Sequence, residues 1–376
     1  MDTTAPVAPP YVVKPFTLRP FRALMLGASG IGDPASARAF ARPYADVPAR
    51  LRHWQDTGRI HRDDDPAVYL HEYTAAGVTI RGLVGALDLS RTSQTCPDAQ
   101  QAVFPHEGVH PEQVDELAAR MQEMHINPAP ILLVHRGPAA MRAVIHEVAQ
   151  TRPTLSFADR ADQVHRLWPL HDPEHLKVLS EGLADTRALI ADGHHRYAAY
   201  LRLQQANPGT AWDFGLAMLV DQSDTPLWLG PIHRFVAGRT MSEVVSACAE
   251  QPGYDCRVMS RWEALEHLGD HTLVLTDDTT WATLTLPSAD VLAVATLDEV
   301  LLPLLSVEKR NISFHHTAES ALVQARTHSG TCILMPIPPF DAVADAAGAG
   351  ILLPEKATSF QPKPSLGVLM RSLLDE

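Results

Sequence analysis

Short apolar segments that come in pairs are the feature that most constrains the fold of this chain. Residues 66–73 (PAVYLHEY) alternate apolar and polar side chains, residues 78–90 (VTIRGLVGALDLS) are more continuously apolar, and TAAG lies between them. This pattern predicts a β-hairpin. Residues 154–170 and 272–286 show the same arrangement, so we expect further hairpins there.

Segments with helical spacing lie between these hairpins. Residues 138–150 begin at Pro138, and residues 172–185 open with Asp172 and Pro173, which favour the first turn of a helix. Hairpins mixed with helices predict an α+β fold with a mixed sheet, rather than a doubly wound parallel sheet.

The length of 376 residues predicts two domains. Residues 1–20 contain five prolines and few large apolar side chains, which suggests an extended N-terminal arm. The alternation of helices and strands restarts near Met241. We therefore predict a first domain over residues 21–238 and a smaller second domain over residues 239–376.

Composition excludes several classes of function. The chain carries 31 Lys and Arg against 44 Asp and Glu, a net charge of −13, and it has no basic run. Such a surface repels nucleic acids and anionic membranes. The four cysteines lie far apart, and neither a signal peptide nor an apolar run of roughly 20 residues is present. We expect a cytoplasmic protein with a small-molecule substrate and neither a nucleic-acid nor a membrane partner; the oligomeric state stays open.

The segment HEGVH, from His106 to His110, has the spacing of a zinc-protease motif. That chemistry requires both histidines on one face of a helix. Pro111 follows directly, and in a helix its ring would clash with the carbonyl of Glu107. We therefore expect a loop, in which His106 and Glu107 remain available for another role.

The segment LGASGIGD, residues 26–33, is similar to a glycine-rich dinucleotide turn. That fingerprint needs a strand before it, a helix after it and a second strand ending in an acidic residue. Pro43 interrupts the following segment, and no clear second strand comes at the right distance. We expect a plain glycine-rich loop.

The segment LIADGHHRYAAYLRL, residues 189–203, carries the strongest chemical signal. A short apolar run stops at Asp192 and Gly193, and a helical pattern begins after them. The N-terminus of a helix offers free N–H groups to phosphate. Arg196 can bind phosphate oxygens with two parallel bonds, and Asp192 can accept a proton or hold a metal.

A purely structural alternative also explains these residues. Asp192 can cap the helix while the two histidines cover its first turn. Side chains that fill the junction, with the guanidinium of Arg196 bound internally, would remove the basis for phosphate binding.

IADGHHRYAAYL resembles the turn that binds nucleotide phosphates in the ParB/sulfiredoxin superfold. The whole chain resembles the family known as domain of unknown function 1015. The segments that carry this resemblance are RPFRAL (19–24), PAVYLHEY, VFPHE, VHRLW, IADGHHR, GPIHRFV and LPEKATSFQPKPSLGVLMRSL (353–373). The resemblance implies a ParB/sulfiredoxin-like core with a second, smaller α/β domain. Relatives on this superfold include free-serine kinases, sulfiredoxin and the DNA clamp ParB.

The same resemblance implies roles for individual residues, which follow the matched motifs. Gly193, His194, His195 and Arg196 would hold nucleotide phosphates. Asp192 would be the catalytic or metal-binding acid, and His106 and Glu107 would form the second half of the site. His233, Arg234, Lys356 and Lys363 would contact the substrate.

The resemblance predicts a phosphotransferase that uses ATP or ADP, or else CTP, together with Mg²⁺, and phosphorylates a small hydroxyl compound such as serine. The chain departs from the family pattern over residues 25–45 and 108–116, which leaves two alternatives open. One is a nucleotide-binding regulatory protein without catalysis. The other is a ParB-like DNA-binding protein, which the net charge of −13 disfavours.

Overall fold

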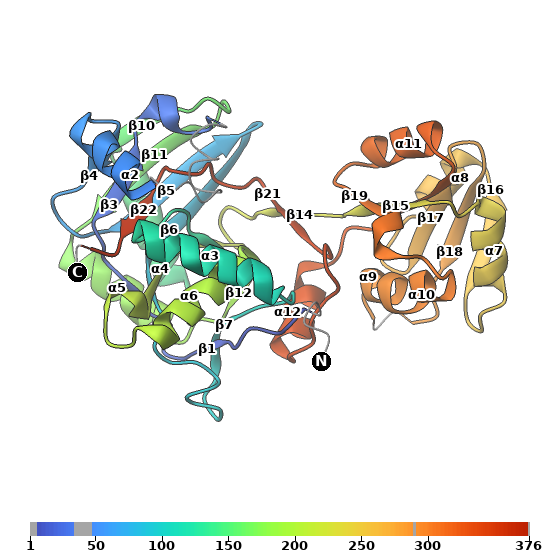
Figure 1. Ribbon diagram of the computed structural model, residues 1–376, viewed down its shortest axis with the longest axis horizontal. Coiled ribbons are helices and arrows are strands. Elements are labelled where there is room, and N and C mark those ends of the chain that lie inside the picture. Colours follow the sequence, from blue (N-terminus) through green and yellow to red (C-terminus); the bar gives the residue numbers. More distant parts are fainter. Residues whose placement is uncertain (1–5, 34–46, 289–290, 375–376) are drawn as a thin grey trace. The chain divides into compact units, whose positions relative to one another are not determined.

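The computed structural model describes residues 6–33, 47–288 and 291–374 (Figure 1). The chain forms two compact units. The first unit contains residues 1–227 and 362–376, and the second contains residues 228–361. The first unit thus ends at residue 227, eleven residues before the predicted boundary at 238. The structure also returns the last segment of the chain to the first unit, because the end of the chain adds a strand to a sheet there.

A large mixed sheet forms the centre of the first unit. Both predicted hairpins of this unit are present in it, and the α+β class is confirmed. Parallel pairing joins β12 to β7 and β13 to β9, whereas the other neighbours are antiparallel. In spatial order the strands are β1 (Val12–Val13), β7 (Gln101–Phe104), β12 (Ala188–Asp192), β9 (Ile131–His135), β13 (Phe214–Asp221), β6 (Val78–Asp88), β5 (Val68–Ala75), β11 (Val164–Leu170) and β10 (Leu155–Ala158), with β2 (Leu18–Arg19) also pairing with β6.

Four helices pack their apolar faces into one core with this sheet. They are α3 (Pro111–Met124), α4 (Ala139–Ala149), α5 (Pro173–Ala184) and α6 (His194–Ala206). The start of α5 is as predicted, because the Asp172 carboxylate accepts hydrogen bonds from the backbone N–H groups of Glu174 and His175. The first unit also contains α2 (Val47–Asp56) and a small sheet of β4 (Ile60–Arg62), β3 (Ala23–Leu26), β22 (Met370–Ser372) and β8 (Ile126–Asn127).

Neither of the two segments that we expected to be loops is an α-helix. His106 to His110 form an irregular segment, and α3 begins at Pro111, where the missing N–H of proline costs nothing. The glycine-rich segment contains only a single short turn, η1 (Ala28–Gly30), among its residues. Residues 34–46, which include Pro43, lie outside the described residues.

Residues 6–20 of the N-terminal arm contribute two short strands, β1 and β2, to the large sheet. Val12 and Val13 form β1, and their side chains are buried together with that of Phe16. Val7 exchanges two backbone hydrogen bonds with Val109, and the ring of Pro6 packs against Gly108. The arm therefore holds the His106–His110 loop in place, which gives its proline-rich sequence a structural role.

The second unit is built on a sheet of its own, whose spatial order is β16 (Asp255–Met259), β18 (Trp281–Thr285), β17 (Thr272–Thr276), β20 (Gly330–Leu334), β15 (His233–Ala237) and β19 (Ile312–His315). A separate ribbon pairs β14 (Trp228–Gly230) with β21 (Ser359–Gln361), so the chain enters and leaves this unit side by side. Its helical segments are α7 (Met241–Ala249), α8 (Arg261–Glu266), α9 (Ala293–Thr296), α10 (Leu302–Leu304), α11 (Ala318–Thr327) and α12 (Phe340–Gly348).

One helical segment of the second unit is irregular. Residues Leu297–Leu301 form a π-helical turn that leads into α10. Pro303 has no N–H group to donate to a preceding carbonyl, which disfavours a continuous α-helix at this point. Among the described residues, no helix is long and apolar enough to cross a membrane.

Candidate functional site

The junction between β12 and α6 has the backbone geometry that the sequence predicts. Ala188 to Ala191 are buried in the sheet, and Asp192 ends the strand with its side chain partly exposed. Gly193 follows with a φ of 93°, a conformation that residues with a Cβ atom rarely adopt. The N-cap residue, Gly193, makes no side-chain hydrogen bond to the first turn of α6.

The hydrogen bonds of Asp192 in the described part of the chain do not cap α6. Its carboxylate instead binds two cations. Arg196 Nη2 donates to Oδ2 at 2.8 Å, and Lys363 Nζ donates to Oδ1. Burial raises the pKa of Asp192, but the charges and hydrogen bonds of Arg196 and Lys363 outweigh burial and hold this pKa below its ordinary value. Asp192 is thus an ionised carboxylate between two cations.

Arg196 folds back toward the start of its own helix. A Cβ atom at position 193 would lie 2.8 Å from Arg196 Nη2, so the glycine makes room for this guanidinium. Arg196 Nε is buried and has no hydrogen-bond partner among the described residues. The side chains of Arg196 and Asp192 remain 24% and 29% exposed. The guanidinium is thus bound internally, yet the ion pair is still open to solvent.

The His106–His110 loop is attached to the first turn of α6 through the two histidines of that turn. The backbone N–H of His106 donates to His194 Nε2 at 3.4 Å, and that of His110 donates to His195 Nε2 at 3.1 Å. In the neutral form each of these two imidazoles therefore carries its proton on Nδ1. The rings of His110 and His195 are stacked, with 5.9 Å between their centroids.

Glu107 lies between two buried imidazoles. Its Oε2 is 3.8 Å from His194 Nδ1, and its Oε1 is 3.9 Å from His106 Nε2. Burial lowers the pKa of His106 to about 4 and that of His194 well below its usual range, with the neighbouring charges of His106, His195 and Lys363 adding to the effect at His194. Both rings are neutral at pH 7, so Glu107 does not face an imidazolium there.

The structure thus gathers the predicted residues of the first unit into one cluster. Among the described residues, however, no group of three His, Cys, Asp or Glu side chains is arranged to hold a metal ion. Asp192, the predicted metal ligand, is already neutralised by two cations. Its surroundings therefore do not fit a metal site made by the protein alone.

Three residues that hold this cluster together were not predicted. His110 supplies a backbone donor to His195. Tyr73 donates its hydroxyl hydrogen to the carbonyl of Pro362, and Gln163 Nε2 donates to the carbonyl of Lys363, which positions the lysine. The HEGVH motif already pointed to His110, whereas nothing in the sequence relates Tyr73 or Gln163 to residue 363.

Comparison with models of known protein families identifies the family of this chain. A model of the family described as "Protein of unknown function (DUF1015)" matches residues 19–301 of the 376. The chain belongs to this family. No curated protein matches the sequence.

Solved structures that share features with this DUF1015 protein are distant from it. A free serine kinase variant in complex with ADP has a TM-score of 0.40 and 16% identity, over 71% of this chain and 88% of that one. SbnI from Staphylococcus aureus, truncated at its C-terminus, gives 0.43 and 12% over 78% and 90%. A conserved hypothetical protein from Pyrococcus furiosus gives 0.38 and 15% over 73% and 93%.

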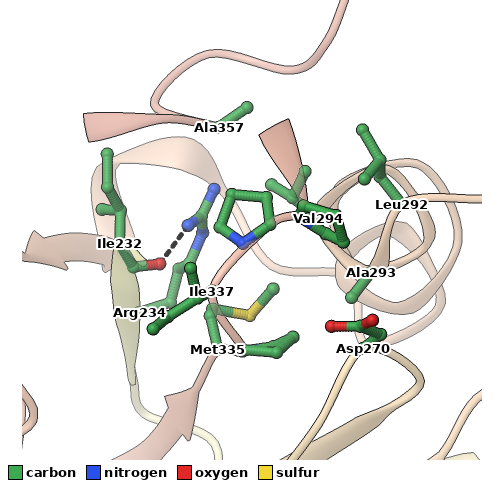
Figure 2. Close-up of a pocket in the computed structure, with 12 residues that line it drawn as sticks. Ile232, Arg234, Asp270, Leu292, Ala293, Val294, Met335, Ile337 and Ala357 are labelled. Atoms are coloured by element: carbon green, nitrogen blue, oxygen red, sulfur yellow. Dashed lines mark hydrogen bonds between the residues drawn. The ribbon is translucent and has the colours of Figure 1, made fainter. Parts of the chain in front are cut away.

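The other predicted substrate contacts of this DUF1015 protein lie in its second unit. Arg234 is fully buried; it pairs with Asp298 at 3.1 Å and donates to the carbonyl of Lys356 at 3.2 Å. His233 Nδ1 accepts a hydrogen bond from the backbone N–H of Met335. Figure 2 shows Arg234, bonded to the carbonyl of Ile232, at the wall of a cavity of about 20 Å³. This volume admits a water molecule but no metabolite.

Proposed function

We propose that this protein is a nucleotide-dependent phosphotransferase that acts on a small hydroxyl-bearing metabolite such as free serine. The observation that carries the proposal is the position of Asp192, a carboxylate held by Arg196 and Lys363 in front of a helix N-terminus. Two cations beside the positive end of a helix dipole are elements that stabilise a transferring phosphoryl group.

Nucleotide phosphates would replace Asp192 as the partner of both cations. Arg196 and Lys363 hold the pKa of Asp192 low, so losing them to phosphate would raise this pKa and make the carboxylate a better proton acceptor. In this scheme Asp192 or Glu107 takes the proton of the attacking hydroxyl group. Mg²⁺ would arrive with ATP or ADP, since this ion commonly binds through substrate phosphates and one or two carboxylates.

The proposal is tested by supplying ATP, ADP or CTP with Mg²⁺ and a panel of amino acids, and measuring nucleotide binding and nucleotide consumption separately. We expect Asp192→Asn and Glu107→Gln to abolish consumption while nucleotide still binds. Glu112→Gln, at an exposed position at the start of α3, is the matched control and should leave both measurements unchanged.

A substitution of Arg196 tests nucleotide binding. We expect Arg196→Ala to weaken nucleotide binding, while Arg202→Ala, on the same helix but paired with Asp115 of α3, leaves it intact. Failure of every nucleotide to bind at millimolar concentration would refute the proposal. If the wild-type protein binds a nucleotide without consuming it, the second candidate is favoured, a nucleotide-binding regulatory protein. The contacts of Asp192 with Arg196 and Lys363 support this candidate equally.

A further inference from the structure

A groove of about 710 Å³ lies in the first unit, away from the Asp192 cluster. Its walls come from the segment that contains β2, the end of β6, the residues that precede β13, and Ser372 of β22. Ligand sites for metabolites commonly occupy 300–1,000 Å³. Helix α6 begins at the Asp192 cluster and ends three residues before Gly209, which lines the groove. Thirteen residues of helix separate the two sites by about 20 Å.

One wall of the groove presents two arginines that can still bind a ligand. Arg22 Nε donates to the carbonyl of Asp64 at 2.8 Å, and its two terminal nitrogens have no partner among the described residues. The guanidinium of Arg19 lies 4.5 Å from the centre of the Phe214 ring. Two planar guanidinium groups beside one hollow are suited to binding a carboxylate.

The groove also contains a carboxylate with a free oxygen. Both the backbone N–H and the hydroxyl group of Ser90 donate to Asp88 Oδ1, at 2.9 and 2.6 Å. Asp88 Oδ2 has no such partner in the described part of the chain. Asp213, by contrast, accepts one bond on each oxygen, from Gln204 and from the N–H of Gly209. Asp88 therefore keeps one whole carboxylate oxygen available for an ammonium group.

The buried side chain of Arg371 holds the part of the groove wall that contains Ala211 and Phe214. Arg371 is fully buried and donates to the carbonyls of Phe214 and Ala211 at 2.7 and 2.9 Å, and to Asn127 Oδ1 at 3.2 Å. These bonds fix the two groove residues Ala211 and Phe214 before any ligand arrives. Preorganisation of this kind lowers the entropy lost on binding.

We propose that this groove binds a small zwitterion, namely a free α-amino acid, whose carboxylate contacts Arg19 and Arg22 and whose ammonium group contacts Asp88. The charged side chains that line the groove are two arginines and two aspartates, so their charges cancel. A simple anion would meet the aspartates and a simple cation would meet the arginines, whereas a zwitterion satisfies both. The proposal is independent of phosphoryl transfer at Asp192.

Calorimetric titration of the full-length protein with amino acids that lack a hydroxyl group tests the proposal, because these cannot accept a phosphoryl group. We expect at least one such amino acid to bind with a millimolar or lower dissociation constant, and propionate and ethylamine to bind at least tenfold more weakly. Absence of binding below 10 mM, or equal binding of propionate, would overturn the proposal.

Substitutions locate the binding site. We expect Arg22→Ala and the nearly isosteric Asp88→Asn each to weaken binding at least tenfold, with melting temperatures recorded to confirm folding. Arg152→Ala, at an exposed position of the same unit, is the control and should have no effect. Loss of binding in Lys363→Ala with retention in Asp88→Asn would place the amino acid at the Asp192 cluster and refute a site in the groove.

Discussion

Lys363 donates a hydrogen bond to the carboxylate of Asp192 although 171 residues separate them in the sequence. The lysine reaches this position because the chain returns to the first unit after completing the second. Tyr73 and Gln163 hold the carbonyls of residues 362 and 363 at that point. A residue from the end of the chain thus supplies one of the two cations at the proposed phosphate site.

Lys363→Ala is expected to weaken nucleotide binding by about 10- to 100-fold, because a hydrogen bond to a charged group is worth about 1.5–3 kcal/mol. Lys363→Arg should recover part of the affinity, since it keeps the charge. Lys356→Ala removes the other lysine of the terminal motif, which is exposed in the second unit, and should leave nucleotide affinity unchanged. Equal affinity in the wild type and Lys363→Ala would contradict the assigned role.

Acidification should destabilise the first unit partly through His106. Burial lowers the pKa of this histidine from 6.5 to about 4, so between these values the unfolded chain binds a proton that the folded chain excludes. Its contribution to stability is complete above pH 6.5 and is lost as the pH falls toward 4. Urea unfolding at pH 7.5 and 4.5 measures this loss.

The variant His106→Gln should show a smaller drop in unfolding free energy between these two pH values than the wild type. His61→Gln changes an imidazole that is 74% exposed in the same unit, and it should reproduce the wild-type drop. An identical drop in His106→Gln and the wild type would show that this buried histidine does not set the acid sensitivity.

One of the two hydrogen bonds between the N-terminal arm and the His106–His110 loop can be removed by a single substitution. Val7→Pro eliminates the N–H that donates to the carbonyl of Val109 at 2.8 Å, while Val7→Ala keeps it. We expect faster hydrogen exchange of the Val109 amide, and slower nucleotide consumption, in Val7→Pro only. Unchanged exchange at Val109 would show that the arm does not restrain the loop.

Arg234 is expected to stabilise the second unit. Arg234→Met leaves Asp298 without its buried partner, which should cost about 3–5 kcal/mol of unfolding free energy. The double variant Arg234→Met with Asp298→Leu should be less destabilised than the sum of the two single variants. Fluorescence of Trp262 and Trp281, both in the second unit, reports this unfolding. Additive effects of the two substitutions would argue against the ion pair.

Local patterns predicted those helices and strands whose position is determined by residues close to them in the sequence. The alternation around residues 66–90 identified β5 and β6, Asp172 identified the start of α5, and Pro111 excluded a helical zinc motif. Gly193 marked the beginning of α6 because its backbone conformation suits glycine.

Contacts between distant segments could not be predicted in this way. The pairing of Val7 with Val109, the attachment of His195 to the N–H of His110, and the approach of Lys363 to Asp192 all depend on tertiary packing. Periodicity and spacing describe one segment at a time. They found His106, Glu107 and residues 192–196 of the candidate site, but neither Tyr73 and Gln163 nor the bonds among these residues.

The ribbon of β14 and β21 brings the two ends of the second unit together. Trp228 pairs directly with Gln361, so the second unit is an insertion that leaves and rejoins the host chain at a single point. A brief glycine-rich turn joining residues 227 and 362 would excise it and leave Lys363 attached to the remainder. Measurements on this shortened protein would show whether the first unit functions without the second.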